Sequence, residues 1–300
     1  MVKSQTVFMD LGDPSPLPDG MGKQVIWTKI KRLPDITAAT TEGTPPTPIA
    51  ITSAQVTAAV SQYKDAIQWS DFWQKTNANS DVESVLKERV AEQMSRSLDI
   101  VTRNALTTDI GTTYYANNAG ALSSLDSGDD LTLGDIRSQK LVLEANDVGP
   151  HKSGYYVFVG HPNTIYDMKS DTATGGWIDV HKYTDAGRKQ LFNAEVGEVD
   201  MIKIKSTTLI SKTNSGTSGS AYAYTNFLFG MQPFGVVDLG KGNKALNIYA
   251  KGFGSAGTAD PVDELATLGW KAYYVAKYFG DVSAVSDPDR AIKIVSGRTA

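Results

Sequence analysis

A long amphipathic helix, predicted from Asp81 to about Thr107, constrains the fold of this chain more than any other feature. Ser80 and Glu83 can form a capping box at its start. Apolar side chains then recur at helical spacing and make one stripe. The stripe consists of Val82, Val85, Leu86, Val90, Met94, Leu98, Val101 and Ala105. At about 1.5 Å per residue the helix would be roughly 40 Å long, which suits a strut across a flat subunit better than a compact α/β enzyme.

The opposite face of this helix carries acid–base pairs spaced four residues apart. In each pair the acid precedes the base, which is the favourable order on a helix. The pairs are Glu83 with Lys87, Glu92 with Arg96, and Asp99 with Arg103. We therefore expect a polar outer face opposite the apolar stripe.

A β-rich segment before the helix predicts a long hairpin. Gln24–Leu33 has a strand pattern, Pro34–Pro48 is a loop crowded with Thr, Pro and Gly, and an extended run returns from Ile49 to about Trp69. A two-stranded hairpin is marginally stable alone in water. Because no third strand is adjacent in the sequence, we expect the hairpin to lie against another surface, and one candidate is a neighbouring subunit.

The segments on either side of these elements are less regular. Met1–Lys23 is rich in proline, glycine and aspartate, which predicts an extended arm or loop. Gly111–Asp130 is a polar loop. Thr132 as cap, with Asp135 three residues later, marks the start of a second helix that runs to about Asn146.

The second half of the chain predicts a buried strand, a short helix and then a series of strands. Tyr155–Val159 is a continuous apolar run, and after it Pro162 suits the first position of a helix. The later strands are expected at Met201–Ser206, Thr208–Ser211, Ala221–Phe229, Gly235–Leu239, Leu246–Ala250 and Gly269–Phe279. From Asp287 the tail is polar, with one short apolar patch at Ile292–Val295.

Composition limits the chemistry that is open to the chain. Its 29 basic and 33 acidic residues give a net charge of −4, whereas a protein that mainly grips phosphate usually carries a basic surplus. The absence of cysteine excludes disulfides, thiolate metal sites and a cysteine nucleophile. Because the sequence has neither a membrane-spanning apolar run nor a signal-peptide pattern, we expect a soluble protein of the cytoplasm without a membrane partner.

The histidines and the glycine-rich motifs do not indicate a catalytic or metal site. His151, His161 and His181 are too far apart in the sequence for metal-site spacing, and a loop or capping role explains His161 better. Gly252–Gly257 matches a dinucleotide-binding turn, but no helix is expected at its third glycine to meet a pyrophosphate. Gly216–Ser220 approaches a hydrolase nucleophile turn and fails at its last position.

Paired carboxylates and clustered aromatic residues also have ordinary explanations. Carboxylate pairs could serve acid–base catalysis, but a solvated helix face and a turn explain them better. They are Asp167 with Asp171, and Asp260 with Asp263 and Glu264. Aromatic residues could stack on bases, but without interleaved arginines they indicate core and interface. They are Trp69, Phe72, Trp73, Tyr155, Tyr156, Tyr273 and Tyr274. We expect no catalytic, cofactor or metal site and no enzyme.

A set of short stretches follows a recognisable order over nearly the whole chain. They are Thr41-Glu42-Gly43-Thr44-Pro45, Val60-Ser61-Gln62-Tyr63, Trp69-Ser70-Asp71, the long helix, Gly160-His161-Pro162 followed by Asp167, and Asp260-Pro261 followed by Gly269-Trp270-Lys271. In this order they resemble the N4-like family of tailed-phage major capsid proteins. The chain departs from that family at its N-terminus, where family members usually have a longer helical arm before the first strand.

The resemblance implies an α+β chain of the Hong Kong 97-type phage capsid fold. That fold has an extended β-hairpin loop, a long spine helix, and peripheral and axial domains. The implied divisions are 1–23 for an N-terminal arm, 24–70 for the extended hairpin loop, 71–119 for the peripheral domain with the spine helix, 120–265 for the axial domain, and 266–300 for the return to the peripheral domain and the C-terminal tail.

The resemblance also implies a function and a set of partners. Copies of the chain would assemble in the host cytoplasm into hexamers and pentamers of an icosahedral virion shell, enclosing double-stranded DNA without sequence specificity. Portal, scaffolding and decoration proteins are further candidate partners, and no cofactor is implied. Contacts between subunits are implied at Glu42, Gly43, Thr44, Pro45, Lys87, Arg89, Arg96 and Arg103.

Two other hypotheses remain open. A protein cage subunit of the same fold would enclose cargo enzymes instead of a genome, and the size and contents of the purified shell would distinguish it. A mixed α/β ligand-binding protein or enzyme would form a discrete monomer or small oligomer with a pocket of converging polar groups. Light scattering on the purified protein would distinguish that class from a shell subunit.

Overall fold

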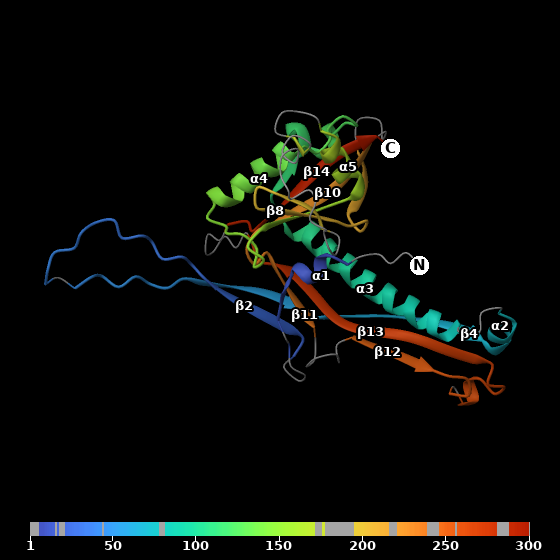
Figure 1. Ribbon diagram of the computed structural model, residues 1–300. Helices are drawn as coiled ribbons and strands as arrows, with labels where there is room; N and C mark the ends of the chain where they lie inside the picture. Colours follow the sequence, from blue (N-terminus) through green and yellow to red (C-terminus); the bar gives the residue numbers. More distant parts are fainter. Residues whose placement is uncertain are drawn as a thin grey trace.

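The computed structural model has two β-sheets joined by one long helix, with a hairpin that projects from the body (Figure 1). It describes residues 6–15, 17, 22–43, 45–77, 82–171, 176–177, 195–215, 221–238, 246–255, 257–280 and 288–299. Thr44, Ser80, His181 and the loop Gly216–Ser220, all named above, lie outside these ranges. In the view of Figure 1 one sheet lies above the other, and we call them the upper and the lower sheet.

The long helix α3 (Val82–Asp109) confirms the prediction, and its 28 residues correspond to about 42 Å. Val82, Val90 and Leu98 of the apolar stripe are buried. The expected pair of Glu83 with Lys87 is present at 2.7 Å.

Asp99 is the exception on this helix. The sequence places it on the polar outer face, but its side chain is fully buried and accepts hydrogen bonds from the N–H groups of Val7 and Met9. The prediction is wrong for Asp99 because the N-terminal segment covers this part of α3.

The lower sheet is built around β13 (Leu265–Tyr278), whose side chains alternate between a buried and a half-exposed face. This alternation is typical of a strand with one face on a core, and α3 covers that face. The Thr102 and Tyr274 hydroxyls are hydrogen-bonded across the contact, 2.7 Å apart. The other described strands of this sheet are β1 (Asp13–Pro14), β4 (Ser61–Ser70), β11 (Phe234–Asp238) and β12 (Leu246–Lys251). β4, β11 and β12 pair with β13 in antiparallel fashion, and β1 pairs with β11 in parallel.

The upper sheet has the strand order β5-β14-β10-β6-β8-β7 in the described residues, and β9 also pairs with β10. The bounds are β5 (Thr113–Tyr115), β6 (Tyr156–Gly160), β7 (Glu195–Val199), β8 (Ile202–Ser206), β9 (Ser211–Ser215), β10 (Ala221–Phe229) and β14 (Ala291–Thr299). Both faces of β6 are buried: Val157 and Val159 belong to the core shared with α3, and Tyr156 and Phe158 to a second core under the upper helices. A strand covered on both faces reads as a continuous apolar run, as the sequence predicts here.

Among the described residues, two helices cover the second core. α4 (Leu133–Ala145) begins with the predicted capping box of Thr132 and Asp135, and α5 (Pro162–Ser170) begins at the predicted proline. The side chain of His161 caps α5 by accepting a hydrogen bond from the Asn163 N–H, which confirms a capping role. The short helices are α1 (Phe8–Leu11), α2 (Asp71–Thr76), η1 (Ala116–Asn118), η2 (Leu122–Ser124) and η4 (Gly257–Ala259).

Several strands differ from the sequence predictions, and β7 (Glu195–Val199) is one that the sequence does not predict. β14 forms in what the sequence predicts as a polar tail, because it is inserted between β10 and β5 and buried there. β5 forms inside the segment predicted as a polar loop, since it pairs with β14. The strand expected at Thr208–Ser211 begins only at Ser211, as β9. Leu209 and Ile210 are buried, but they lie in a turn in which the Thr207 hydroxyl accepts a hydrogen bond from the Leu209 N–H.

The predicted hairpin is present. β2 (Gln24–Ile30) and β3 (Ser53–Ala59) pair in antiparallel register, and no other strand of the described chain joins them. The returning run is interrupted at Val60, after which the chain continues as β4 in the lower sheet. The hairpin is therefore a two-stranded extension whose second strand leads directly into the body.

The N-terminal strap, defined here as Val7–Ser15, lies where the two sheets meet (Figure 1). The sequence predicts an extended arm or loop, but this part of it forms α1 and β1 and is largely buried. The Phe8 ring packs edge-on against Phe227 of β10, with ring centroids 5.5 Å apart. Full burial of such a side chain contributes roughly 1.5–3 kcal/mol, so the strap is part of the core.

Candidate assembly surfaces

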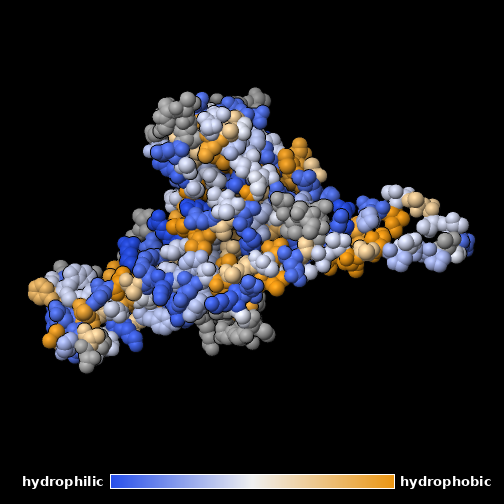
Figure 2. Space-filling view, turned by 180° about the vertical axis from the view of Figure 1, so that it is seen from behind, coloured by the Kyte–Doolittle hydropathy of each residue, from blue (hydrophilic) through white to orange (hydrophobic). Residues whose placement is uncertain are grey.

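The hairpin loop between β2 and β3 is exposed along its whole described length. Ile36 has 79% of its surface in solvent, and it is one of several large aliphatic side chains exposed on the hairpin. The others are Ile26, Ile30, Leu33, Ile49 and Ile51. Figure 2 shows these hydrophobic residues along the projection on the right of that view. Clustered exposed apolar surface of this kind indicates a protein-binding surface.

The base of the hairpin is fixed to the body at several points. The Trp27 ring packs against Phe279 with centroids 5.1 Å apart, and its indole N–H donates to the Ser15 hydroxyl at 3.0 Å. The Lys29 ammonium lies over the Phe279 ring, and Arg32 pairs with Asp147 at 2.8 Å. These contacts set the direction in which the hairpin leaves the body.

The predicted contact residues at the hairpin tip are accessible. Glu42, Gly43 and Pro45 are exposed, and Gly43 has a φ of +83°, a conformation that other residues rarely adopt. Thr44 lies outside the described residues. The tip is far from α3, so the two predicted sets of contact residues do not form one site (Figure 1).

The predicted basic residues on α3 differ among themselves. Lys87, Arg89 and Arg96 are exposed, and Lys87 and Arg89 form ion pairs with acids of their own helix. Arg103 is half-buried and donates a hydrogen bond to the Leu209 carbonyl oxygen. Burial lowers the pKa of Arg103, and nearby Asp99 opposes that effect. Arg103 therefore joins α3 to the upper sheet within the chain.

A second apolar surface lies at the end of the body opposite the hairpin (Figure 2). It includes Val262, with 76% of its surface exposed, and Phe72 and Trp73 of α2. Phe253 and Leu265 lie on the neighbouring segments. The sequence indicates Phe72 and Trp73 as core or interface, and exposure favours interface. Val262 gives no signal in the sequence, because a single valine in a polar turn has no periodicity.

A groove of about 570 Å³ lies where the hairpin base meets α3 and β13. Its lining includes four alanines, and it also includes the ion pair of Lys277 with Asp109, 2.9 Å apart. The lining residues are Thr57, Ala58, Ala59, Tyr63, Val101, Asn104, Ala105, Thr108, Asp109, Val275, Ala276 and Lys277. This lining offers a shallow surface for a chain segment, and its one acid is held by the adjacent lysine.

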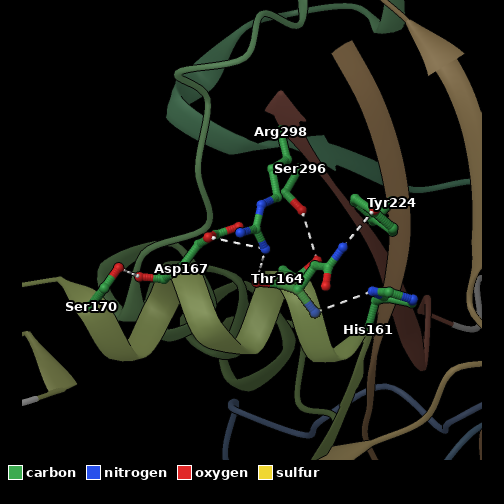
Figure 3. Close-up of polar contacts among 8 residues, drawn as sticks. His161, Thr164, Asp167, Ser170, Tyr224, Ser296 and Arg298 are labelled. Atoms are coloured by element: carbon green, nitrogen blue, oxygen red, sulfur yellow. Dashed lines mark hydrogen bonds and ion pairs between the residues drawn. The ribbon is translucent and has the colours of Figure 1, made fainter. Parts of the chain in front are cut away.

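The polar residues around α5 form a structural network (Figure 3). Arg298 donates to the Asn163 carbonyl oxygen at 3.1 Å and lies 3.4 Å from the Asp167 carboxylate. The side-chain amide of Asn163 donates to the Tyr224 hydroxyl at 3.0 Å, and the His161 ring stacks on Tyr224. These bonds tie α5 to β10 and β14.

Two of the paired carboxylates, Asp167 and Asp260, make structural contacts. Asp167 is mostly buried beside Arg298, so its expected place on a solvated helix face is wrong. Burial raises the pKa of Asp167, and Arg298 opposes that effect. Asp260 accepts a hydrogen bond from the Leu265 N–H, which confirms its role in a turn.

Metal-ligand clusters and membrane-spanning helices are absent from the described residues. No group of three metal-ligating side chains gathers in that part of the chain. The glycine motif that begins at Gly252 leads into the short helix η4 and then β13, not into an α-helix. No helix among the described residues has the length and apolar character that a membrane span requires.

Comparison with known proteins identifies solved structures of the same fold. The capsid of Ralstonia phage GP4 matches with a TM-score of 0.75 at 14% identity, over 100% of this chain and 93% of that chain. The capsid of cyanophage Pam1 matches with a TM-score of 0.71 at 13% identity, over 100% and 94%. The capsid of cyanophage P-SCSP1u matches with a TM-score of 0.66 at 16% identity, over 99% and 89%. No protein-family model and no curated protein sequence matches the chain.

At these identities the likeness establishes the fold. The chain has the Hong Kong 97-type fold of phage capsid proteins, which confirms the expected fold class. The match runs over the full described architecture, including both sheets, α3 and the hairpin.

Proposed function

We propose that this chain is the major capsid protein of a tailed bacterial virus, a structural subunit without catalytic activity. Its copies would assemble into hexamers and pentamers of an icosahedral shell around double-stranded DNA. The observation that carries the proposal is the end-to-end likeness to phage capsids, with 100% of this chain and 93% of the GP4 phage capsid chain matched.

The exposed apolar hairpin supports the same proposal from the structure alone. A chain that is stable as a monomer does not usually hold a two-stranded ribbon of exposed isoleucines away from its body. A closed shell gives such a ribbon a partner, because each subunit offers the same surfaces to its neighbours. The apolar surface at the opposite end of the body would be covered in the same way.

We further propose how the elements are divided between shell domains. α3 and the lower sheet would form the peripheral domain, and the upper sheet with α4 and α5 the axial domain. This assigns β11 and β12 to the peripheral domain and β14 to the axial domain, because strands belong with the sheet in which they pair.

Contacts between subunits are proposed at the hairpin tip and on the outer face of α3. The tip offers Glu42, Gly43, Thr44 and Pro45, and α3 offers Lys87, Arg89 and Arg96. Arg103 would contribute less, because it already binds the Leu209 carbonyl within the chain.

Imaging the purified chain tests the proposed function. The protein is expressed alone, examined by negative-stain electron microscopy, and sized by light scattering over a range of salt and crowding conditions. We expect closed or partial shells of uniform curvature. A chain that stays monomeric in every condition would count against the proposal. Nucleic acid in shells purified from infected cells would support a capsid, and a protein cargo would indicate a cage instead.

A further inference from the structure

The N-terminal strap is held from below by the lower sheet and by α3. The Ser15 N–H donates to the Val236 carbonyl oxygen at 2.9 Å, in line with the pairing of β1 and β11. The Asp99 carboxylate of α3 accepts from the Val7 N–H at 3.2 Å and from the Met9 N–H at 2.9 Å. In these contacts the strap donates its hydrogen bonds from backbone N–H groups.

The strap is held from above by the loop that precedes β6 in the upper sheet. His151 Nε2 lies 3.0 Å from the Leu11 carbonyl oxygen. Lys152 donates to the Gly12 carbonyl oxygen at 3.1 Å and pairs with the Asp13 carboxylate at 3.1 Å. The strap thus ties the upper sheet to the lower sheet and α3, and its Val7, Phe8 and Leu11 belong to the core that these elements share.

The protonation state of His151 follows from its surroundings. A carbonyl oxygen only accepts, so Nε2 must carry the hydrogen, and the neutral ring then has an unprotonated Nδ1. The His151 side chain is 5% exposed, and Nδ1 has no hydrogen-bond partner among the described residues. A second proton would therefore create a buried charge without an acceptor at that atom.

The charged groups that act on His151 come from three segments of the chain. Lys152 lies on its own loop, Lys205 on β8 and Asp13 on the strap. Burial lowers the pKa of His151 most, and the two lysines lower it further. The Leu11 carbonyl and Asp13 act in the opposite direction without reversing the shift.

We propose that the N-terminal strap is an acid-sensitive latch between the upper sheet and the rest of the chain, held closed by neutral His151 and released when His151 is protonated. The latch is a property of the single chain. Its test therefore stands whether or not the proposed shell function is correct.

The direction of the pH effect follows from linkage. With the strap released, His151 would have an ordinary pKa of about 6.5, whereas in the closed state its pKa is lower. The closed state then binds fewer protons than the open state. Closure is fully favoured above about pH 6.5 and weakens as the pH falls from there towards the lower pKa of the closed state.

Asp99 acts in the opposite direction. Burial raises its pKa, with nearby Asp10 adding to the shift and the backbone N–H groups of the strap opposing it. The closed state therefore binds more protons at Asp99 than the open state does. Acidification through the pH range in which Asp99 titrates therefore favours closure, so Asp99 cannot be the group that opens the latch.

Hydrogen exchange measured by mass spectrometry on the full chain tests the latch. Protection of the peptide that spans the strap is compared at about pH 7.5 and about pH 5.5, after correction for the intrinsic exchange rate. We expect protection to fall by up to about tenfold at the lower pH. The limit follows because an open-state histidine of pKa about 6.5 is mostly protonated at about pH 5.5 and mostly neutral at about pH 7.5, which favours the open state by about that factor. A peptide from β10 serves as the internal reference.

The variant His151→Gln is the matched control. A glutamine amide can donate to the Leu11 carbonyl oxygen and does not titrate in this range. We expect the strap of H151Q to be equally protected at both pH values. The variant His161→Gln, which removes the other histidine of the described residues, should keep the wild-type acid response.

Two results would overturn the latch. One is a wild-type strap whose protection, relative to β10, does not change between the two pH values. The other is an H151Q variant that retains the acid response. If H151Q does not fold, the His151 titration followed by NMR in the wild-type chain decides: a midpoint at or above about 6.5 contradicts the proposal.

Discussion

Gly12 shows how closely a single residue of the strap is fitted. A Cβ atom added there would lie 2.2 Å from Val236 Cγ2 and 2.8 Å from Phe234 Cε2, well inside van der Waals contact. Both neighbours belong to the buried strand β11, so neither can move freely. The position needs glycine for space, since its φ of −72° is open to any residue.

The substitution Gly12→Ala should therefore displace the strap. We expect a loss of about 1–3 kcal/mol in the free energy of unfolding of unassembled subunits, as overpacking in a core typically costs. Urea titration measures the loss. Gly128→Ala is the control, because nothing lies within 4 Å of its added methyl group. Equal stability of the two variants would show that the strap is not tightly packed.

The burial of Asp99 is a residue-scale feature that the sequence does not predict. Its spacing with Arg103 is that of an exposed helix pair, and helical periodicity alone cannot reveal a covering segment. The N–H groups that bind Asp99 belong to Val7 and Met9. These residues are far from Asp99 in the sequence, so only the tertiary structure brings them together. The hydrogen bond between His151 and Leu11 cannot be predicted from the sequence for the same reason.

At the scale of elements, α4 shows how much one cap contributes. The Thr132 hydroxyl accepts from the Asp135 N–H at 3.2 Å, and the Asp135 carboxylate accepts from the Thr132 N–H at 3.0 Å. Both bonds satisfy donors that the start of a helix would otherwise leave unpaired. The helix they start covers the second core, so fraying would expose Leu133 and Ile136.

The substitution Thr132→Ala should lower the free energy of unfolding by about 1 kcal/mol, the usual value of a lost N-cap. Thr132→Ser keeps the hydroxyl and should recover most of the stability. Ser138→Ala, on an exposed turn of the same helix, should change little. These values come from urea or thermal unfolding of unassembled subunits. A cap role is contradicted if Thr132→Ser is as destabilised as Thr132→Ala.

Element prediction succeeds where the signal is local. α3, α4 and β6 are predicted correctly because an apolar stripe, a capping box and a continuous apolar run each lie within one segment. β14 is missed because its lysine, serine and arginine resemble a polar tail. It is a central strand because it pairs with β10 on one side and β5 on the other, which the local sequence does not reveal. Of the two candidate assembly surfaces, the sequence predicts the hairpin. It does not predict the apolar surface around Val262, because the fold brings together residues from separate segments there.

At the scale of the whole molecule, the hairpin is the feature that most separates this chain from a self-contained monomer. Its loop from Lys31 to Thr52 is exposed throughout the described residues, while its base is held by Trp27 and Arg32. The loop therefore contributes little to the stability of one subunit. In the proposed shell, its apolar residues would gain a partner when subunits meet.

Replacing Pro34–Pro48 with a two-residue Asn-Gly turn should separate folding from assembly. We expect folded subunits with an almost unchanged melting temperature that do not close shells in electron micrographs. A control that replaces the same segment with a Gly/Ser linker of equal length keeps the reach of the loop and removes its chemistry. Particles of normal appearance from the short variant would refute a role of the tip in assembly.

The continuity of β3 into β4 has a mechanical consequence. β4 pairs with β13 along its whole length of ten residues, from Ser61 opposite Tyr274 to Ser70 opposite Leu265. A pull on the hairpin along its axis loads these ladder bonds in shear, so they share the force instead of breaking one after another. β13 in turn packs on α3. The hairpin is thus anchored to the body by a sheet that packs on α3, and in the proposed shell a force along the hairpin would be carried by these strands.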